Sequence, residues 1–170
     1  MDIRIYCAGP FGFQYKDYSK EKIAKDYRSI LVGNPDKIIH EGEFLPTFRD
    51  NMRVRYNGPF YFYEDQKTAA DIVKEEKERV EEADVVFFYF KGNADCPGTV
   101  TELINAAMLK KRMVIVYEPQ SNTGEPENDV DSSVWYPLMF VGLCNKNASL
   151  HRVSNQEEAL EVFIDYLHNI

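Results

Sequence analysis

The segment Val85-Val86-Phe87-Phe88-Tyr89-Phe90 is an uninterrupted apolar run near the middle of the chain. Lys91 joins it to the loop Gly92-Asn93-Ala94-Asp95-Cys96-Pro97-Gly98, and an Ala- and Leu-rich segment then runs to Lys110-Lys111. A short apolar run bounded in this way is typical of a strand that is covered on both faces of a parallel sheet. Ligands of such sheets bind beyond the carboxyl ends of the strands, so we expect this loop to lie at a ligand site.

Strands and helices are predicted to alternate along the rest of the chain. The predicted strands are 3–8, 37–40, 84–90, 112–117 and 150–153, with 61–63 as a possible further strand and no sustained pattern over 41–56. The predicted helices are 19–31, 68–82, 100–110 and a last one that runs from a capping box at Ser154 and Glu157 to residue 170. This alternation predicts an α/β fold with right-handed crossovers. We expect a single three-layer, doubly wound domain over 1–170, with about five mainly parallel strands, flavodoxin- or Rossmann-like.

Composition excludes several classes of function. The chain has 170 residues, of which 44% are apolar, and its net charge of −8 argues against nucleic-acid polymers and anionic membrane surfaces as partners. The longest apolar run is too short to cross a bilayer, and no signal peptide is evident. The three cysteines have no zinc-ligand spacing, which indicates reduced thiols in a cytoplasmic protein. The patterns GxGxxG and P-loop are absent, and no metal or organic cofactor is implied.

Glu102 is the main candidate for chemistry, and two interpretations compete for it. With Thr99 as the N-cap of the following helix, Glu102 stands in capping-box register, which is common in proteins without activity. Alternatively, Glu102 is a carboxylate at the ligand edge of the sheet and acts as nucleophile or general base. Asp95 in the same loop favours the second interpretation, because two carboxylates in different surroundings can divide nucleophilic and proton-transfer roles.

Residues at the end of the first predicted strand are expected at the same edge. Tyr6 there places a phenol within possible reach of a carboxylate, although a half-buried strand tyrosine explains it as well. The turn Gly9-Pro10-Phe11 would direct backbone N–H groups to a ligand. Asp95 by itself also suits an Asx turn, and Glu75 and Glu76 suit a solvated helix face. Cys96 has no histidine near it in sequence and is interpreted as an ordinary loop cysteine.

Four motifs occur in a fixed order in the chain. They are Ile5-Tyr6-Cys7-Ala8-Gly9-Pro10-Phe11, Glu82-Ala83-Asp84-Val85-Val86, Asp95-Cys96-Pro97-Gly98-Thr99-Val100-Thr101-Glu102 and Lys111-Arg112-Met113-Val114-Ile115-Val116. Together they resemble the nucleoside 2-deoxyribosyltransferase family, over most of the chain from Asp2 to about Tyr117. The resemblance implies an enzyme that acts on a nucleoside or nucleotide and a free base.

The resemblance also implies roles for individual residues. Glu102 matches the nucleophile, which attacks the anomeric carbon of a 2′-deoxynucleoside and forms a glycosyl-enzyme ester that a second base or water then attacks. Tyr6 matches the residue that orients this nucleophile, and Asp95 matches the acid associated with the base and its proton. The residues that match substrate-binding positions are Gly9, Pro10, Phe11, Glu76, Gly98 and Thr99. Such two-carboxylate chemistry resembles that of retaining glycosidases.

Two departures from the family pattern bear on specificity. Glu76 stands where the family has an aspartate, and Pro137 stands where the transferases have an asparagine that reaches the 5′ end of the sugar in a neighbouring subunit. Recognition of the 5′ end must therefore differ. We predict transfer of deoxyribose between bases through Glu102, with nucleoside or nucleotide hydrolysis and a non-catalytic nucleotide sensor as alternatives. We also predict a homodimer or larger assembly with its contact near 134–143.

Overall fold

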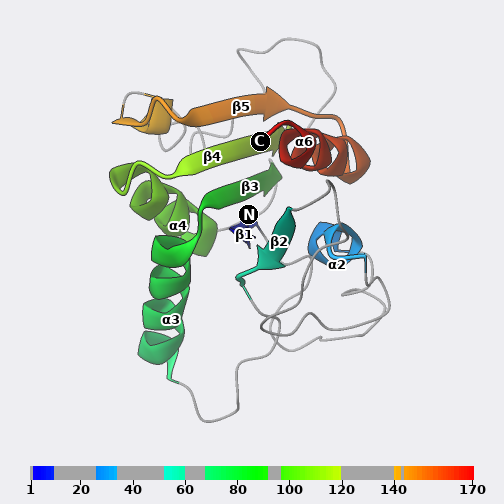
Figure 1. Cartoon of the computed structure of the whole chain (residues 1–170). Helices are drawn as coiled ribbons and strands as arrows, with labels where there is room; N and C mark the ends of the chain where they lie inside the picture. Colours follow the sequence, from blue (N-terminus) through cyan, green and yellow to red (C-terminus); the bar gives the residue numbers. More distant parts are fainter. Residues whose placement is uncertain are drawn as a thin grey trace.

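The computed structural model describes residues 2–9, 26–33, 52–59, 68–91, 97–119, 140–142 and 144–170 (Figure 1). Its elements, in chain order, are β1 (Asp2–Ala8), α2 (Tyr27–Leu31), β2 (Arg53–Tyr56), α3 (Ala69–Glu82), β3 (Val85–Lys91), α4 (Pro97–Met108), β4 (Arg112–Glu118), β5 (Ala148–Arg152) and α6 (Gln156–Asn169).

The five strands form one parallel sheet in the order β2-β1-β3-β4-β5. Strand β3 lies between β1 and β4, with Ile5 opposite Val85 on one side and Val85 opposite Arg112 on the other. This strand order is that of flavodoxin-like doubly wound folds. The predicted α/β fold class with about five parallel strands is therefore confirmed.

The apolar run at 85–90 explains the layering, because all six of its residues are buried. Val85, Phe87 and Tyr89 belong to one hydrophobic core, to which α2 and α6 contribute. Val86, Phe88 and Phe90 belong to a second core, to which α3 and α4 contribute. Helices consequently cover both faces of the sheet, as Figure 1 shows.

Helix starts are set by local capping. At α3, Thr68 Oγ1 accepts from Asp71 N at 3.2 Å and Asp71 Oδ2 accepts from Thr68 N at 3.0 Å, a reciprocal capping box at the predicted start. At α6 the predicted box is wrong by one residue. The N-cap is Asn155, whose Oδ1 accepts from Glu158 N at 2.9 Å, while Glu158 Oε2 accepts from Ser154 N at 2.7 Å.

Strand β2 is the element that the sequence pattern did not predict. Its sequence Arg53-Val54-Arg55-Tyr56 alternates, with Val54 and Tyr56 buried, but four residues are too few for a secure period-2 signal. The predicted strand at 37–40, the possible strand at 61–63 and residues 19–25 of the predicted helix 19–31 lie outside the described residues.

Candidate active site

The candidate site is built on a hydrogen bond between two residues that lie 96 positions apart in the sequence. Tyr6 Oη, on β1, donates to Glu102 Oε1, on α4. Tyr6 is fully buried in the core shared with α3 and α4, so its ring orientation is fixed by packing. The phenol therefore holds one oxygen of the Glu102 carboxyl group in a defined position.

The start of α4 argues against the capping-box interpretation of Glu102. The helix begins at Pro97, a residue type that suits the first helical position because it lacks an N–H donor. Thr99 thus lies inside the first turn, where it is 5% exposed, and the prediction that it is the N-cap is wrong. Glu102 lies in the second turn, too far along to close a capping box. Its side chain is directed to Tyr6 instead.

The Tyr6–Glu102 pair lies where the strand order of the sheet reverses. The chain passes from β1 to β2 on one side and from β3 to β4 on the other, so that β1 and β3 flank the switch point. Tyr6 is near the carboxyl end of β1, and α4 follows the carboxyl end of β3. In open α/β sheets this is the position of the ligand crevice.

The surroundings of Glu102 disfavour its ionised form. Burial raises the pKa of this carboxyl group to about 8, and the negative charge of Glu76 on α3 acts in the same direction. The hydrogen bond from Tyr6 and the positive charge of Arg28 lower the pKa and only partly offset burial. A carboxyl group that is poorly solvated near neutral pH is typical of catalytic sites.

Glu75 and Glu76 are not the solvated helix face that the sequence predicted. Both side chains are partly buried. Glu75 Oε1 accepts from Arg79 Nη2 at 2.9 Å, and Glu76 is close enough to Glu102 to affect its ionisation. Sequence alone could not reveal this, because the pattern of glutamates on α3 also suits full exposure.

The segment after β2 supports the Tyr6 ring. Gly58 O accepts from Cys7 N at 2.8 Å, which continues the pairing beyond β2. A Cβ atom built on Gly58 would lie 3.2 Å from both Tyr6 Cε2 and Arg79 Cδ, and its φ of +119° suits only glycine without strain. Asn57 Nδ2 donates to Arg79 O at 2.9 Å and ties this segment to α3.

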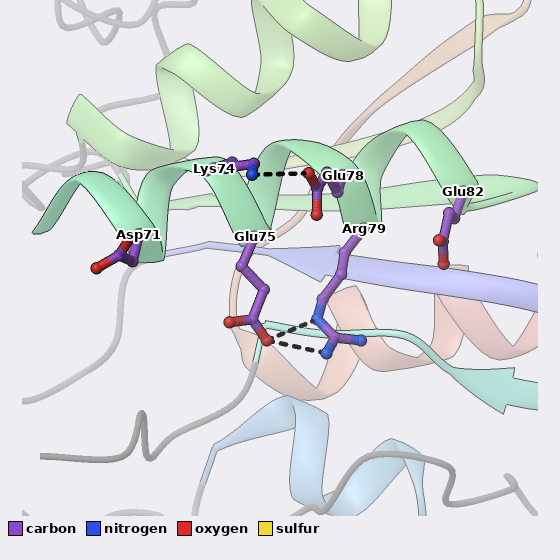
Figure 2. Close-up of a pocket in the computed structure, with 6 residues that line it drawn as sticks. All are labelled: Asp71, Lys74, Glu75, Glu78, Arg79 and Glu82. Carbon is purple, nitrogen blue, oxygen red and sulfur yellow. Dashed lines mark hydrogen bonds and ion pairs between the residues drawn. The ribbon is translucent and has the colours of Figure 1, made fainter. Parts of the chain in front are cut away.

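A hollow of about 360 Å³ lies along α3 beside this support (Figure 2). Its lining residues are Asp71, Lys74, Glu75, Glu78, Arg79 and Glu82. Figure 2 shows the Glu75 and Arg79 side chains directed to the same side of the helix, joined by their ion pair. Because Arg79 also contacts Gly58, the hollow borders the support of Tyr6 but does not contain Glu102.

Of the other predicted site residues, the structure describes two glycines and leaves three residues undescribed. Gly9 is buried at the end of β1, where an added Cβ would lie 2.9 Å from Tyr89 O. Gly98 is exposed on the first turn of α4, and no described atom lies within 4 Å of a Cβ built on it. Asp95, Pro10 and Phe11 lie outside the described residues, as do Cys96 and Pro137.

Arg28 is a residue of this region that the sequence pattern did not single out. It is fully buried on the five-residue helix α2, and its Nε donates to Cys7 O at 2.7 Å and its Nη2 to Gly9 O at 2.6 Å. Asp26, which caps α2, accepts from Arg28 Nη1 at 2.9 Å. No signal in one sequence distinguishes such an arginine from a solvated one, because charged residues are mostly exposed.

Neither a metal-ligand cluster nor a membrane-spanning helix occurs among the described residues. There, no three His, Cys, Asp or Glu side chains are grouped as metal ligands would be. No helix among the residues placed by the structure combines the length and apolar character needed to cross a membrane. Of the predicted contact region 134–143, only 140–142 is described, so the predicted homo-oligomer stays a prediction.

Comparison with solved structures places the fold among known proteins. The Clostridium botulinum CMP N-glycosidase BcmB is similar with a TM-score of 0.56 at 13% identity, over 96% of this chain and 98% of its own. A conserved protein from Enterococcus faecalis V583 is similar with a TM-score of 0.54 at 16% identity, over 98% of this chain and 99% of its own. Aquifex aeolicus Era, bound to GDP and AlF4−, gives 0.50 at 14% identity, over 97% of this chain but 56% of that chain.

At these identities the likeness shows the fold alone. No protein-family model matches the sequence, and no curated protein matches it. A glycosidase and a GDP-bound protein share the architecture, so the fold alone does not determine the function.

The raised pKa of Glu102 predicts a pH-dependent cost to stability. The folded state holds this proton more tightly than the unfolded chain, so stability is lost as pH rises from about 4.5 to about 8. Glu102→Gln cannot ionise and should be more stable than the wild type at pH 8 by about 1–2 kcal/mol, a range reduced for partial exposure. Thermal melts should show this difference at pH 8 and little of it at pH 4.5. If the wild type and Glu102→Gln melted at the same temperature at pH 8 as well as at pH 4.5, the raised pKa of Glu102 would be contradicted.

Proposed function

We propose that this protein cleaves the N-glycosidic bond of a nucleotide or nucleoside, with Glu102 as the nucleophile. The observation that carries the proposal is the Tyr6–Glu102 hydrogen bond at the switch point of the sheet. Support also comes from the resemblance of four ordered motifs to the nucleoside 2-deoxyribosyltransferases. The similarity in fold to a CMP N-glycosidase over nearly the whole of both chains agrees with it.

The proposed first step uses the two oxygens of the carboxylate differently. Tyr6 donates to Oε1, so Oε2 is the oxygen that would attack the anomeric carbon. The C–N bond breaks as the ester bond forms, and the base leaves with the bonding electrons and takes up a proton, for which Asp95 is the proposed source. A carboxylate in a poorly solvated position stabilises an oxocarbenium-like transition state more strongly than one in water.

In the second step, an acceptor attacks the anomeric carbon and releases Glu102. With water as the acceptor the products are free base and sugar or sugar phosphate, and with a second base the product is a new nucleoside. The sequence favoured base exchange. Similarity to a glycosidase and the presence of Pro137 now favour water as acceptor and a nucleotide as substrate. Transfer is the second candidate.

Product analysis separates these reactions. The protein is incubated with CMP, dCMP and deoxycytidine, each with and without free adenine, and the products are followed by chromatography. Free cytosine without a new nucleoside means hydrolysis, whereas an adenine nucleoside or nucleotide means transfer. No product over hours, with nucleotide binding seen by calorimetry, would instead identify a non-catalytic sensor.

Removal of the carboxyl group should abolish the chemistry. We expect Glu102→Ala and Glu102→Gln to lower kcat by at least about a thousandfold, because a covalent route needs the nucleophile. In the wild type, mass spectrometry of a quenched reaction should find the sugar on the peptide that contains Glu102. Full activity in Glu102→Ala would refute the assignment.

The direction of the pH dependence tests the role of Glu102 separately. A nucleophile must be ionised, so kcat/KM should rise with pH until about 8, the pKa of the free site. If Glu102 were instead the general acid, kcat/KM would fall as pH increases through 8. Tyr6→Phe removes the hydrogen bond that favours ionisation and should move the rising limb to higher pH.

Gly98 offers a test of where the substrate lies. Its surroundings in the described structure are open, so Gly98→Ala should keep or raise the melting temperature, since alanine favours a helix by up to about 1 kcal/mol. If the substrate approaches the backbone there, the added methyl group should raise KM by about fivefold or more with little change in kcat. Unchanged kinetics in a stable variant would remove Gly98 from the binding site.

A further inference from the structure

The carboxyl end of β1 is held by side chains from α2. Three successive carbonyl oxygens accept hydrogen bonds from this helix: Cys7 O from Arg28 Nε at 2.7 Å, Ala8 O from Tyr27 Oη at 2.9 Å and Gly9 O from Arg28 Nη2 at 2.6 Å. The first of these carbonyls belongs to the residue that follows Tyr6. The position of the Tyr6 ring is therefore fixed from α2 as well as from the core in which it lies.

The charge of Arg28 matters because it is buried. The guanidinium is 0% exposed, and a buried charge interacts more strongly with its surroundings than a solvated one. Helix α2 contributes to the core on one face of the sheet, whereas Tyr6 and α4 belong to the core on the other. The side chains with the largest effects on the ionisation of Glu102 within the described structure are Tyr6 from β1, Glu76 from α3 and Arg28 from α2.

We propose that Arg28 is a positioning residue of the active site: its guanidinium fork fixes the end of β1 that carries Tyr6 and thereby the hydrogen bond from Tyr6 to Glu102, and its buried positive charge attracts the Glu102 carboxylate. The proposal rests on the function proposed above. Arg28 is the one cation among the side chains with the largest effects on Glu102 within the described structure, and Glu76 opposes it. Its charge therefore favours the form of Glu102 that attacks.

The carboxylate of Asp26 opposes the positive charge of Arg28. It accepts from Arg28 Nη1 at 2.9 Å and is itself buried, so it offsets part of the positive charge. Substitutions at the two positions should therefore move the ionisation of Glu102 in opposite directions. A purely structural arginine would affect stability at both positions without this opposition in sign.

The test measures the pKa of the Glu102 carboxyl group directly, by NMR titration of protein labelled with ¹³C in its glutamate carboxyl groups. Glu102→Gln assigns the resonance. We expect the pKa of Glu102 to rise by about half a pH unit or more in Arg28→Met and to fall in Asp26→Asn, where the arginine is less compensated. Asparagine also suits the N-cap position of α2, so that Asp26→Asn should fold.

Arg28→Lys separates the charge from the fork. Lysine keeps the positive charge but not the planar set of donors, so Glu102 should titrate near its wild-type pKa while kcat falls about tenfold and KM changes less. The proposal is overturned if Glu102 titrates identically in the wild type and Asp26→Asn, or if both arginine variants shift it equally. The titration of Glu102 in Asp26→Asn tests the proposal even if Arg28→Met fails to fold.

The NMR result and the enzymatic result fail independently. If the wild type cleaves no nucleoside or nucleotide but the opposite shifts are seen, the proposed function is wrong and the coupling of Arg28 to Glu102 stands. If the wild type is active and no shift is seen, the positioning role is wrong and the function stands.

Discussion

The burial of β3 on both faces is the constraint on which the remaining structure depends. Six consecutive apolar residues can leave water only if helices cover both faces of the sheet, and the helices on either side supply those two layers. Strand β1 pairs with β3 on the side opposite β4, and the switch point lies between β1 and β3. The location of the candidate site thus follows from the same residues that form the core.

At that location the chain holds a carboxyl group where solvation is poor. Glu102 has a phenol as its hydrogen-bond donor, a second carboxylate from α3 near it and a buried arginine across the sheet. These influences oppose one another, and the balance leaves the ionisation of Glu102 close to neutral pH. Such a group is costly for stability, and the function proposed for Glu102 would offset that cost, as active sites commonly do.

Much of this arrangement follows from local pattern, and the remainder depends on contacts between distant segments. The strands β1, β3 and β4 and helix α3 follow from the sequence, because the strands are apolar runs and the helix is rich in helix-forming residues. Strand β2 was missed because it is short, and Thr99 was misplaced because Pro97 already starts the helix. The burial of Arg28 and the partial burial of Glu75 depend on partners that no local pattern records.

The sequence separation between Tyr6 and Glu102 has a consequence for when the site exists. Strand β1 is the first to be synthesised, yet it pairs with β2 on one side and β3 on the other, so its final place is available only after both have formed. The tyrosine and the glutamate, 96 residues apart, meet only when β1 and the helix that follows β3 are both in place. A nascent chain, a fragment or a sheet that has opened between β1 and β3 therefore lacks the Tyr6–Glu102 pair, and the proposed activity would be confined to molecules in which these segments are assembled.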